Sequence, residues 1–172
     1  MKGWAARALE LGADAAQVIH PGQIVVADWV RLKCQYGCGA YGTRLTCPPY
    51  SPLPPVTRQV LRHYEQALLL RVEGTGQEED RQRHRLSKLV SEVERELFLT
   101  GHHRAWGMGA GPCPLCESCN LTSTCRFPHQ ARPSMEGCGI DVYATVRQAG
   151  WKIEPVQTPE SPFRLFALVL ME

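Results

Sequence analysis

Eight cysteines are the clearest chemical signal in this 172-residue chain. A cysteine thiolate is a ligand for zinc and for iron–sulfur clusters. Four disulfides would need an oxidising compartment. The apolar stretch at the N-terminus contains Arg7 and Glu10, so it does not predict a signal peptide, and the cytoplasm is the expected location. The cysteines are therefore interpreted as metal ligands.

One cysteine-rich stretch holds four of them, at Cys113, Cys116, Cys119 and Cys125. Three cysteines at every third position, then a fourth with Pro128 close behind it, resemble the ferredoxin run that ligates a cubane cluster. Five residues precede the last cysteine, whereas ferredoxins have three. A single zinc ion normally takes two C-x₂-C pairs about 15–20 residues apart, and here the second pair would overlap the first. The run favours a [4Fe-4S] cluster, with zinc as the weaker alternative.

A second stretch, earlier in the chain, adds three cysteines in a glycine-rich segment, at Cys34, Cys38 and Cys47. Three thiolates in such a segment can hold three corners of another cubane cluster. The eighth cysteine is Cys138. Eight thiolates match the needs of two [4Fe-4S] clusters, and all eight cysteines are therefore candidate cofactor and metal ligands.

The grouping of the eight thiolates is open between three arrangements. In two-cluster ferredoxins the last cysteine of a run ligates the other cluster. By this rule Cys125 would ligate the cluster of the first stretch, and Cys138 the cluster of the triple-cysteine run. A sequential grouping, slightly favoured, keeps the run ending at Cys125 together and gives Cys138 to the first stretch. In the third arrangement one cluster has three protein ligands and an iron open to substrate, while Cys138 is a small buried core residue.

Charged residues near the cysteines allow further interpretations. Lys33, Arg44, Arg126 and Arg132 could compensate the negative charge of a cluster, and Arg132 could equally pair with Glu136. Glu136 and Asp141 flank Cys138 and could donate protons at a cluster, although a role at the start of a helix is favoured for both.

Hydrophobic periodicity predicts the elements that position these stretches. The predicted helices are Trp4–Leu11, Val56–Tyr64, Glu78–Thr100 and Ile140–Ala149. The predicted strands are Ala15–Ile19, Ala67–Val72, Arg104–Met108 and Phe163–Met171. Residues 23–32 fit both a strand and a helix and stay open. The cysteine-rich segments 33–55 and 109–139 are predicted to be loops, because glycine and proline interrupt any long regular element.

This order of elements predicts an α/β (α+β) fold, with a single mixed sheet of about four strands and helices packed on it. The length fits a single metal-binding domain over residues 1–172. The formal net charge of +2 is too small to indicate a nucleic-acid or membrane partner, and no stretch is apolar enough to span a membrane.

Three motifs together resemble a known family. They are Cys34-x₃-Cys38-x₂-Tyr41-Gly42-x₄-Cys47-Pro48-Pro49, the triple-cysteine run, and Arg132-Pro133-Ser134-Met135-Glu136-Gly137-Cys138-Gly139-Ile140-Asp141-Val142. The chain is similar over nearly its whole length to a family of predicted metal-binding proteins, domain of unknown function 2284, from anaerobic bacteria and archaea. The resemblance implies a cysteine-ligated, iron–sulfur-like site and no established reaction.

The sequence thus predicts an iron–sulfur protein for electron transfer, or the redox module of a larger enzyme, that works with a redox partner protein. Two clusters in one small domain would be close enough for rapid electron hopping. An enzyme with an open-iron cluster that acts on a small substrate is one alternative. A zinc-binding structural or interaction module is the other.

Overall fold

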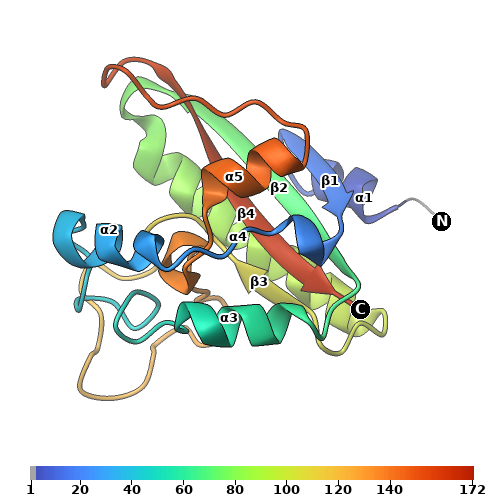
Figure 1. Ribbon diagram of the computed structural model, residues 1–172, viewed down its shortest axis with the longest axis horizontal. Helices are drawn as coiled ribbons and strands as arrows, with labels where there is room; N and C mark the ends of the chain where they lie inside the picture. Colours follow the sequence, from blue (N-terminus) through green and yellow to red (C-terminus); the bar gives the residue numbers. More distant parts are fainter. Residues whose placement is uncertain (1–2) are drawn as a thin grey trace.

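The computed structural model describes residues 3–172, which form one antiparallel sheet with helices on both faces (Figure 1). In chain order the elements are α1 (Trp4–Glu10), β1 (Ala15–Ile19), α2 (Trp29–Gly37), α3 (Pro54–Leu61), β2 (Gln66–Thr75), α4 (Glu79–Leu99), β3 (Trp106–Met108), α5 (Val142–Gln148) and β4 (Pro162–Met171). Short 3-10 turns lie at Pro21–Gln23, Gly76–Glu78 and Glu136–Cys138. The α/β (α+β) class and the single sheet of about four strands are confirmed, but the sheet is antiparallel throughout rather than mixed.

The sheet has the strand order β1-β2-β4-β3, and every neighbouring pair is antiparallel. β2 and β4 form its centre and pair from Gln66 opposite Met171 to Thr75 opposite Pro162. β3 is short and pairs only with the C-terminal part of β4, from Trp106 opposite Leu170 to Met108 opposite Leu168. The N-terminal half of β4 therefore extends past β3, and this half borders the cavity described below.

Both faces of the sheet are buried, which explains why its central strands read as continuous apolar runs. Leu68 and Leu70 of β2 pack in one core with the helices α1 and α4, whereas Leu69 between them packs in a second core with α3 and α5. The alternation follows from strand geometry, in which successive side chains point to opposite faces. Figure 1 shows α4 behind the sheet and α5 in front of it.

The long helix α4 confirms the prediction at Glu78–Thr100 to within one residue at each end. Its buried stripe contains Leu86, Leu89, Val90, Val93 and Leu97. Gly101, with a φ of 110°, reverses the chain directly after the helix, a conformation that favours glycine. No helix within residues 3–172 is long and apolar enough to cross a membrane.

The loop in the first cysteine-rich stretch is shorter than predicted. Residues 23–32, left open between strand and helix, contain the start of α2, and this helix continues through Cys34 to Gly37. α3 begins at Pro54, where proline is well suited to the first helical turn. The predicted loop 33–55 is therefore wrong at both ends, because Cys34 is helical and Pro54 already belongs to α3.

The second stretch is irregular as predicted, apart from the 3-10 turn at Glu136–Cys138. Its two ends are held together beside β3. The Gly109 amide donates to the Pro133 carbonyl at 2.8 Å, and the Met135 amide donates to the Gly109 carbonyl at 2.9 Å. The intervening cysteines thus lie in a closed loop that starts and ends on the sheet.

Candidate metal centre

The two cysteine-rich stretches, far apart in sequence, lie against each other near one end of α2 (Figure 1). The Arg44 guanidinium donates to the carbonyls of Cys116 at 2.6 Å and of Glu117 at 3.0 Å. The Leu45 amide of the first stretch donates to Cys119 Sγ of the second at 3.4 Å. The Cys113 amide lies near enough to the Cys47 thiol to lower its pKa. Arg44 and Leu45 of the first stretch therefore fasten it to the second.

The first thiol set consists of Cys34, Cys38 and Cys47. Cys34 lies near the end of α2, Cys38 follows directly after the helix, and Cys47 is buried in the loop, with 6% of its surface exposed. Burial raises the pKa of Cys47 to about 11, and the charges of Cys38 and Cys34 act in the same direction. The three thiols thus lie close enough for their charges to interact.

The second thiol set consists of Cys113, Cys116, Cys119 and Cys125, all free and all partly exposed. Burial raises the pKa of Cys113, and the other three thiols of the set add to the rise. The Phe127 amide donates to Cys125 Sγ at 3.4 Å, which complements the bond from Leu45 to Cys119. N–H donors to sulfur are among the features that tune cluster-bound thiolates.

Cys138 lies apart from both sets. It is 1% exposed and packs in the core with Met135 and Ile140. Burial raises its pKa to about 12, Glu136 adds to the rise, and Arg31 opposes it. Of the three predicted arrangements, this geometry agrees with the one in which Cys138 is a core residue.

A polar network around Arg31 fastens α2 to the segment that contains Cys138. The Arg31 guanidinium donates to Ser51 Oγ and to the Gly137 carbonyl, both at 3.0 Å. Ser51 Oγ donates to the same carbonyl at 2.6 Å, and Thr57 Oγ1 donates to the Cys138 carbonyl at 2.7 Å. Sequence reasoning missed Arg31, although a helical reading of residues 29–37 would have placed it one turn before Cys34.

The charged residues near the cysteines have mostly structural partners. Arg132 Nε donates to Glu94 Oε2 at 2.7 Å, so the suggested pairing of Arg132 with Glu136 is wrong. Asp141 caps α5, where its Oδ1 accepts from the Ala144 amide at 2.9 Å, as predicted. Arg126 donates to the Ser118 carbonyl at 2.9 Å, within the second stretch.

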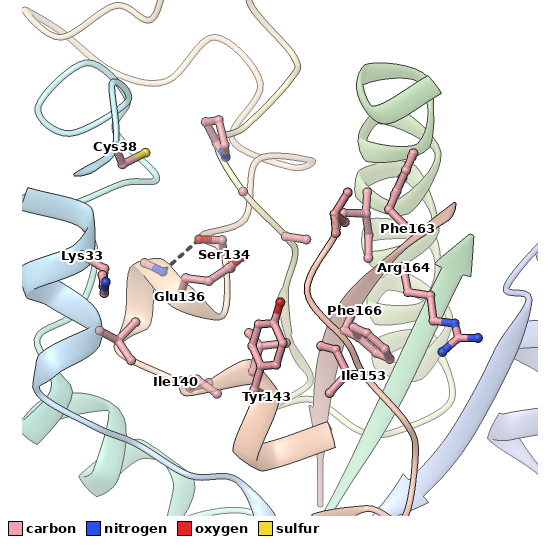
Figure 2. Close-up of a pocket in the computed structure, with 18 of the residues that line it drawn as sticks. Lys33, Cys38, Ser134, Glu136, Ile140, Tyr143, Ile153, Phe163, Arg164 and Phe166 are labelled. Atoms are coloured by element: carbon pink, nitrogen blue, oxygen red, sulfur yellow. Dashed lines mark hydrogen bonds between the residues drawn. The ribbon is translucent and has the colours of Figure 1, made fainter. Parts of the chain in front are cut away.

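A cavity of about 940 Å³ opens beside the first thiol set (Figure 2). Its walls come from α2, the segment 134–143, residues 153–156 and the N-terminal half of β4. Cys34, Cys38 and Cys47 all line it. Figure 2 shows the Cys38 sulfur pointing into this space, with Tyr143 and Phe166 on the other side. The volume lies in the range of small-molecule sites.

Glu136 also lines the cavity rather than serving only to start a helix. Its Oε2 is buried without a hydrogen-bond partner among residues 3–172, although the Ser134 hydroxyl and the amides of Glu136 and Gly111 lie near enough to lower its pKa. Burial nevertheless raises its pKa, because a charged carboxylate is costly away from water. The Ser134 hydroxyl in turn accepts from the Gly137 amide at 2.9 Å, the bond drawn in Figure 2.

The donor chemistry of the two sets fits iron–sulfur clusters. Thiolates are the usual ligands of cubane clusters, and both sets provide free thiols with backbone N–H groups near their sulfurs. Among residues 3–172, no three His, Cys, Asp or Glu side chains are arranged as a ready site for one metal ion.

Comparison with known proteins agrees with the presence of a metal site. A family model described as "Predicted metal-binding protein (DUF2284)" matches residues 17–171. No curated protein matches the chain, and no solved structure does so. Because the family model covers most of its length, this chain belongs to the predicted metal-binding proteins of domain of unknown function 2284.

Proposed function

We propose that the protein binds two [4Fe-4S] clusters and acts as an oxidoreductase on a small molecule held in the cavity. One observation carries the proposal, namely that all three cysteines of the first thiol set line a cavity of about 940 Å³. Three protein thiolates leave one corner of a cubane cluster without a protein ligand. That corner would be available to a molecule in the cavity.

The second thiol set completes the proposed site with four thiolates from one loop. When bound, such clusters supply one-electron transfer at potentials set by charge, hydrogen bonds to sulfur and exposure to solvent. The amides of Leu45 and Phe127 donate to sulfurs of this set and would stabilise added negative charge there. The contacts of Arg44 and Leu45 with the second loop hold the sets close together, which favours electron passage between them.

A simpler electron carrier with a redox partner protein is the second candidate function. It is favoured by the partial exposure of the four thiols of the second set and by two apolar side chains beside them. Leu121 is 39% exposed and Phe127 is 43% exposed. In an electron carrier the cavity would have no role, so binding of a molecule in the cavity would leave the spectrum of the first cluster unchanged.

Anaerobic metal and sulfide analysis of freshly purified protein tests the proposal. We expect about eight irons and eight sulfides per chain, with broad absorption that bleaches on reduction. Cys116→Ser and Cys47→Ser should each lose about four irons, from different clusters. A colourless protein with stoichiometric zinc, or Cys→Ser variants with unchanged iron, would overturn the proposal.

Electron paramagnetic resonance of the reduced variants separates the two clusters. Cys116→Ser should leave only the signal of the first thiol set, and Cys47→Ser only that of the second. A cluster with three protein thiolates exchanges its unligated iron more readily than one with four. We therefore expect mild oxidation to convert only the first cluster to a three-iron form.

A further inference from the structure

The walls of the cavity are rich in aromatic side chains. Four of them come from separate parts of the chain, namely Trp29, Tyr41, Tyr143 and Phe166. Figure 2 shows Tyr143 rising from α5 into the space, with Phe166 of β4 near it, whereas Phe163 lies toward α4. The face of an aromatic ring attracts cations, and several rings around one space reinforce this attraction.

The charged side chains around the cavity are mostly acidic. The acidic residues that line it are Glu73, Glu78, Glu136, Asp141 and Glu154, and the basic ones are Lys33 and Arg164. Arg164 donates to Glu73 at 3.1 Å and to the Lys152 carbonyl at 3.2 Å, and Figure 2 shows its guanidinium directed away from the cavity. Glu78 pairs with Arg81 outside the cavity, which leaves Lys33 with Glu136, Asp141 and Glu154. Acidic side chains therefore still outnumber basic ones, and the cavity disfavours anions.

From the rings and the charges together, we infer that the cavity binds an apolar amine in its cationic form and rejects carboxylates of the same size. The inference rests on the proposed function and names the substrate class for its cavity. The ring system of the amine packs against the aromatic walls, and its ammonium group lies among the acidic side chains. The volume of about 940 Å³ has room for a bicyclic molecule.

Three probes with one ring system test the inference. Naphthylmethylamine, naphthylmethanol and naphthoate differ in charge but hardly in size, and calorimetry measures their binding to the anaerobically purified protein. We expect the amine to bind at least about tenfold more tightly than the alcohol, and naphthoate not to bind measurably. Equal binding of amine and alcohol, tight binding of naphthoate, or no binding of the amine would each overturn the inference.

Iron content, measured on the same samples, keeps the two proposals separate. Full iron with no preference for the amine overturns only the inference about the substrate class. Absence of iron overturns the proposed function, whatever the probes do.

Substitutions in the cavity locate the binding. Tyr143→Leu keeps an apolar side chain but removes a ring, and should weaken binding of amine and alcohol alike by about fivefold. Phe98→Leu is the matched control, because Phe98 is 58% exposed on α4, on the opposite face of the sheet. Equal effects of the two substitutions would overturn the inference.

A second substitution, at an exposed position, tests the inference without disturbing the fold. Glu154 lines the cavity and is exposed, so Glu154→Gln should leave the fold intact. The exposed Glu65 lies outside the cavity and provides the control Glu65→Gln. We expect Glu154→Gln alone to reduce the preference for amine over alcohol, by about twofold. An unchanged preference in both variants would count against the role of the acidic rim.

Discussion

Cys138 shows how little a residue type reveals about its role without its surroundings. Seven cysteines fall into two neighbouring thiol sets, whereas Cys138 packs among apolar residues of the core. From the sequence it could equally complete a set of four thiolates or be a small buried core residue. Its isolation depends on the network of Arg31, Ser51 and Thr57, a set of contacts between distant residues that sequence spacing does not reveal.

The first prediction concerns this residue. Cys138→Ala should leave the iron content unchanged, because neither thiol set loses a member. It should lower the free energy of unfolding by about 1 kcal/mol, since a small buried group is removed from a packed core. Iron analysis and urea unfolding of the variant check both points, and loss of about four irons would show that Cys138 is a ligand after all.

A second prediction concerns thiol reactivity in protein freed of metal. Only thiolates react with iodoacetamide, and burial raises the pKa of Cys47 to about 11 and of Cys138 to about 12. At pH 8 both should therefore react much more slowly than the exposed Cys38. Mass spectrometry of the labelled peptides follows the rates, and equal labelling of Cys138 and Cys38 at pH 8 would contradict the prediction.

The raised pKa values of Cys47 and Cys138 also determine how the stability of the metal-free protein changes with pH. Both thiols hold their protons more tightly when folded than the ordinary value of 9.0 implies. Their protonated state therefore favours the folded form below pH 9, and this contribution is lost as the pH rises toward 11 and 12.

A helix or strand could be predicted from the sequence where its buried residues follow the periodicity of that element. The stripe of α4 is buried residue by residue, and β2 and β4 are covered on both faces, so the sequence pattern identifies all three. α2 was ambiguous because its apolar residues do not face the core. Trp29, Leu32 and Tyr36 are 50%, 56% and 80% exposed, and Val30 is its buried residue.

A third prediction tests how α4 holds the second cysteine-rich stretch. Glu94 on α4 accepts from Arg132 Nε and from the Gly107 amide, both at 2.7 Å, and the two charged side chains are only 13% and 15% exposed. Glu94→Ala leaves Arg132 without its partner in a mostly buried place. We expect a loss of about 2–3 kcal/mol in the free energy of unfolding, measured by urea denaturation.

An exposed pair on the same helix region serves as control for this prediction. Arg81 pairs with Glu78, but the Arg81 side chain is 72% exposed. Water screens such a pair, so Arg81→Ala should cost less than about 1 kcal/mol. Equal losses for Glu94→Ala and Arg81→Ala would show that the Glu94 contacts do not hold the loop.

At the scale of the whole molecule, the sheet and the thiol sets are largely separate structures. The core between α4 and the sheet includes Leu68, Leu86 and Val169 but, among residues 3–172, no cysteine. The other core includes Cys138 alone among the eight. Class and strand number were therefore predictable from local patterns. The cavity was not, because it forms where α2, the segment 134–143 and β4 meet.

This separation leads to the last prediction, which concerns removal of iron by a chelator. The ladder between β2 and β4 uses no group from either cysteine-rich stretch, and the buried stripe of α4 packs on strands of the sheet, so both should persist. Hydrogen exchange should stay slow in β2, β4 and α4 and become fast in residues 38–53 and 109–131, where thiolate–iron bonds would otherwise restrain the loops. Far-UV circular dichroism should change little.

Cys116→Ser sharpens this test, because it should speed exchange in residues 109–131 and leave residues 38–53 closer to their iron-loaded behaviour. The coupling between the loops through Arg44 and Leu45 sets how far the effect spreads. Small metal-dependent domains behave differently, since they unfold as a whole when the metal is removed. Cooperative loss of hydrogen-exchange protection in β2 and β4 on chelation would therefore mean that the metal centre, and not the packing on both faces of the sheet, stabilises this fold.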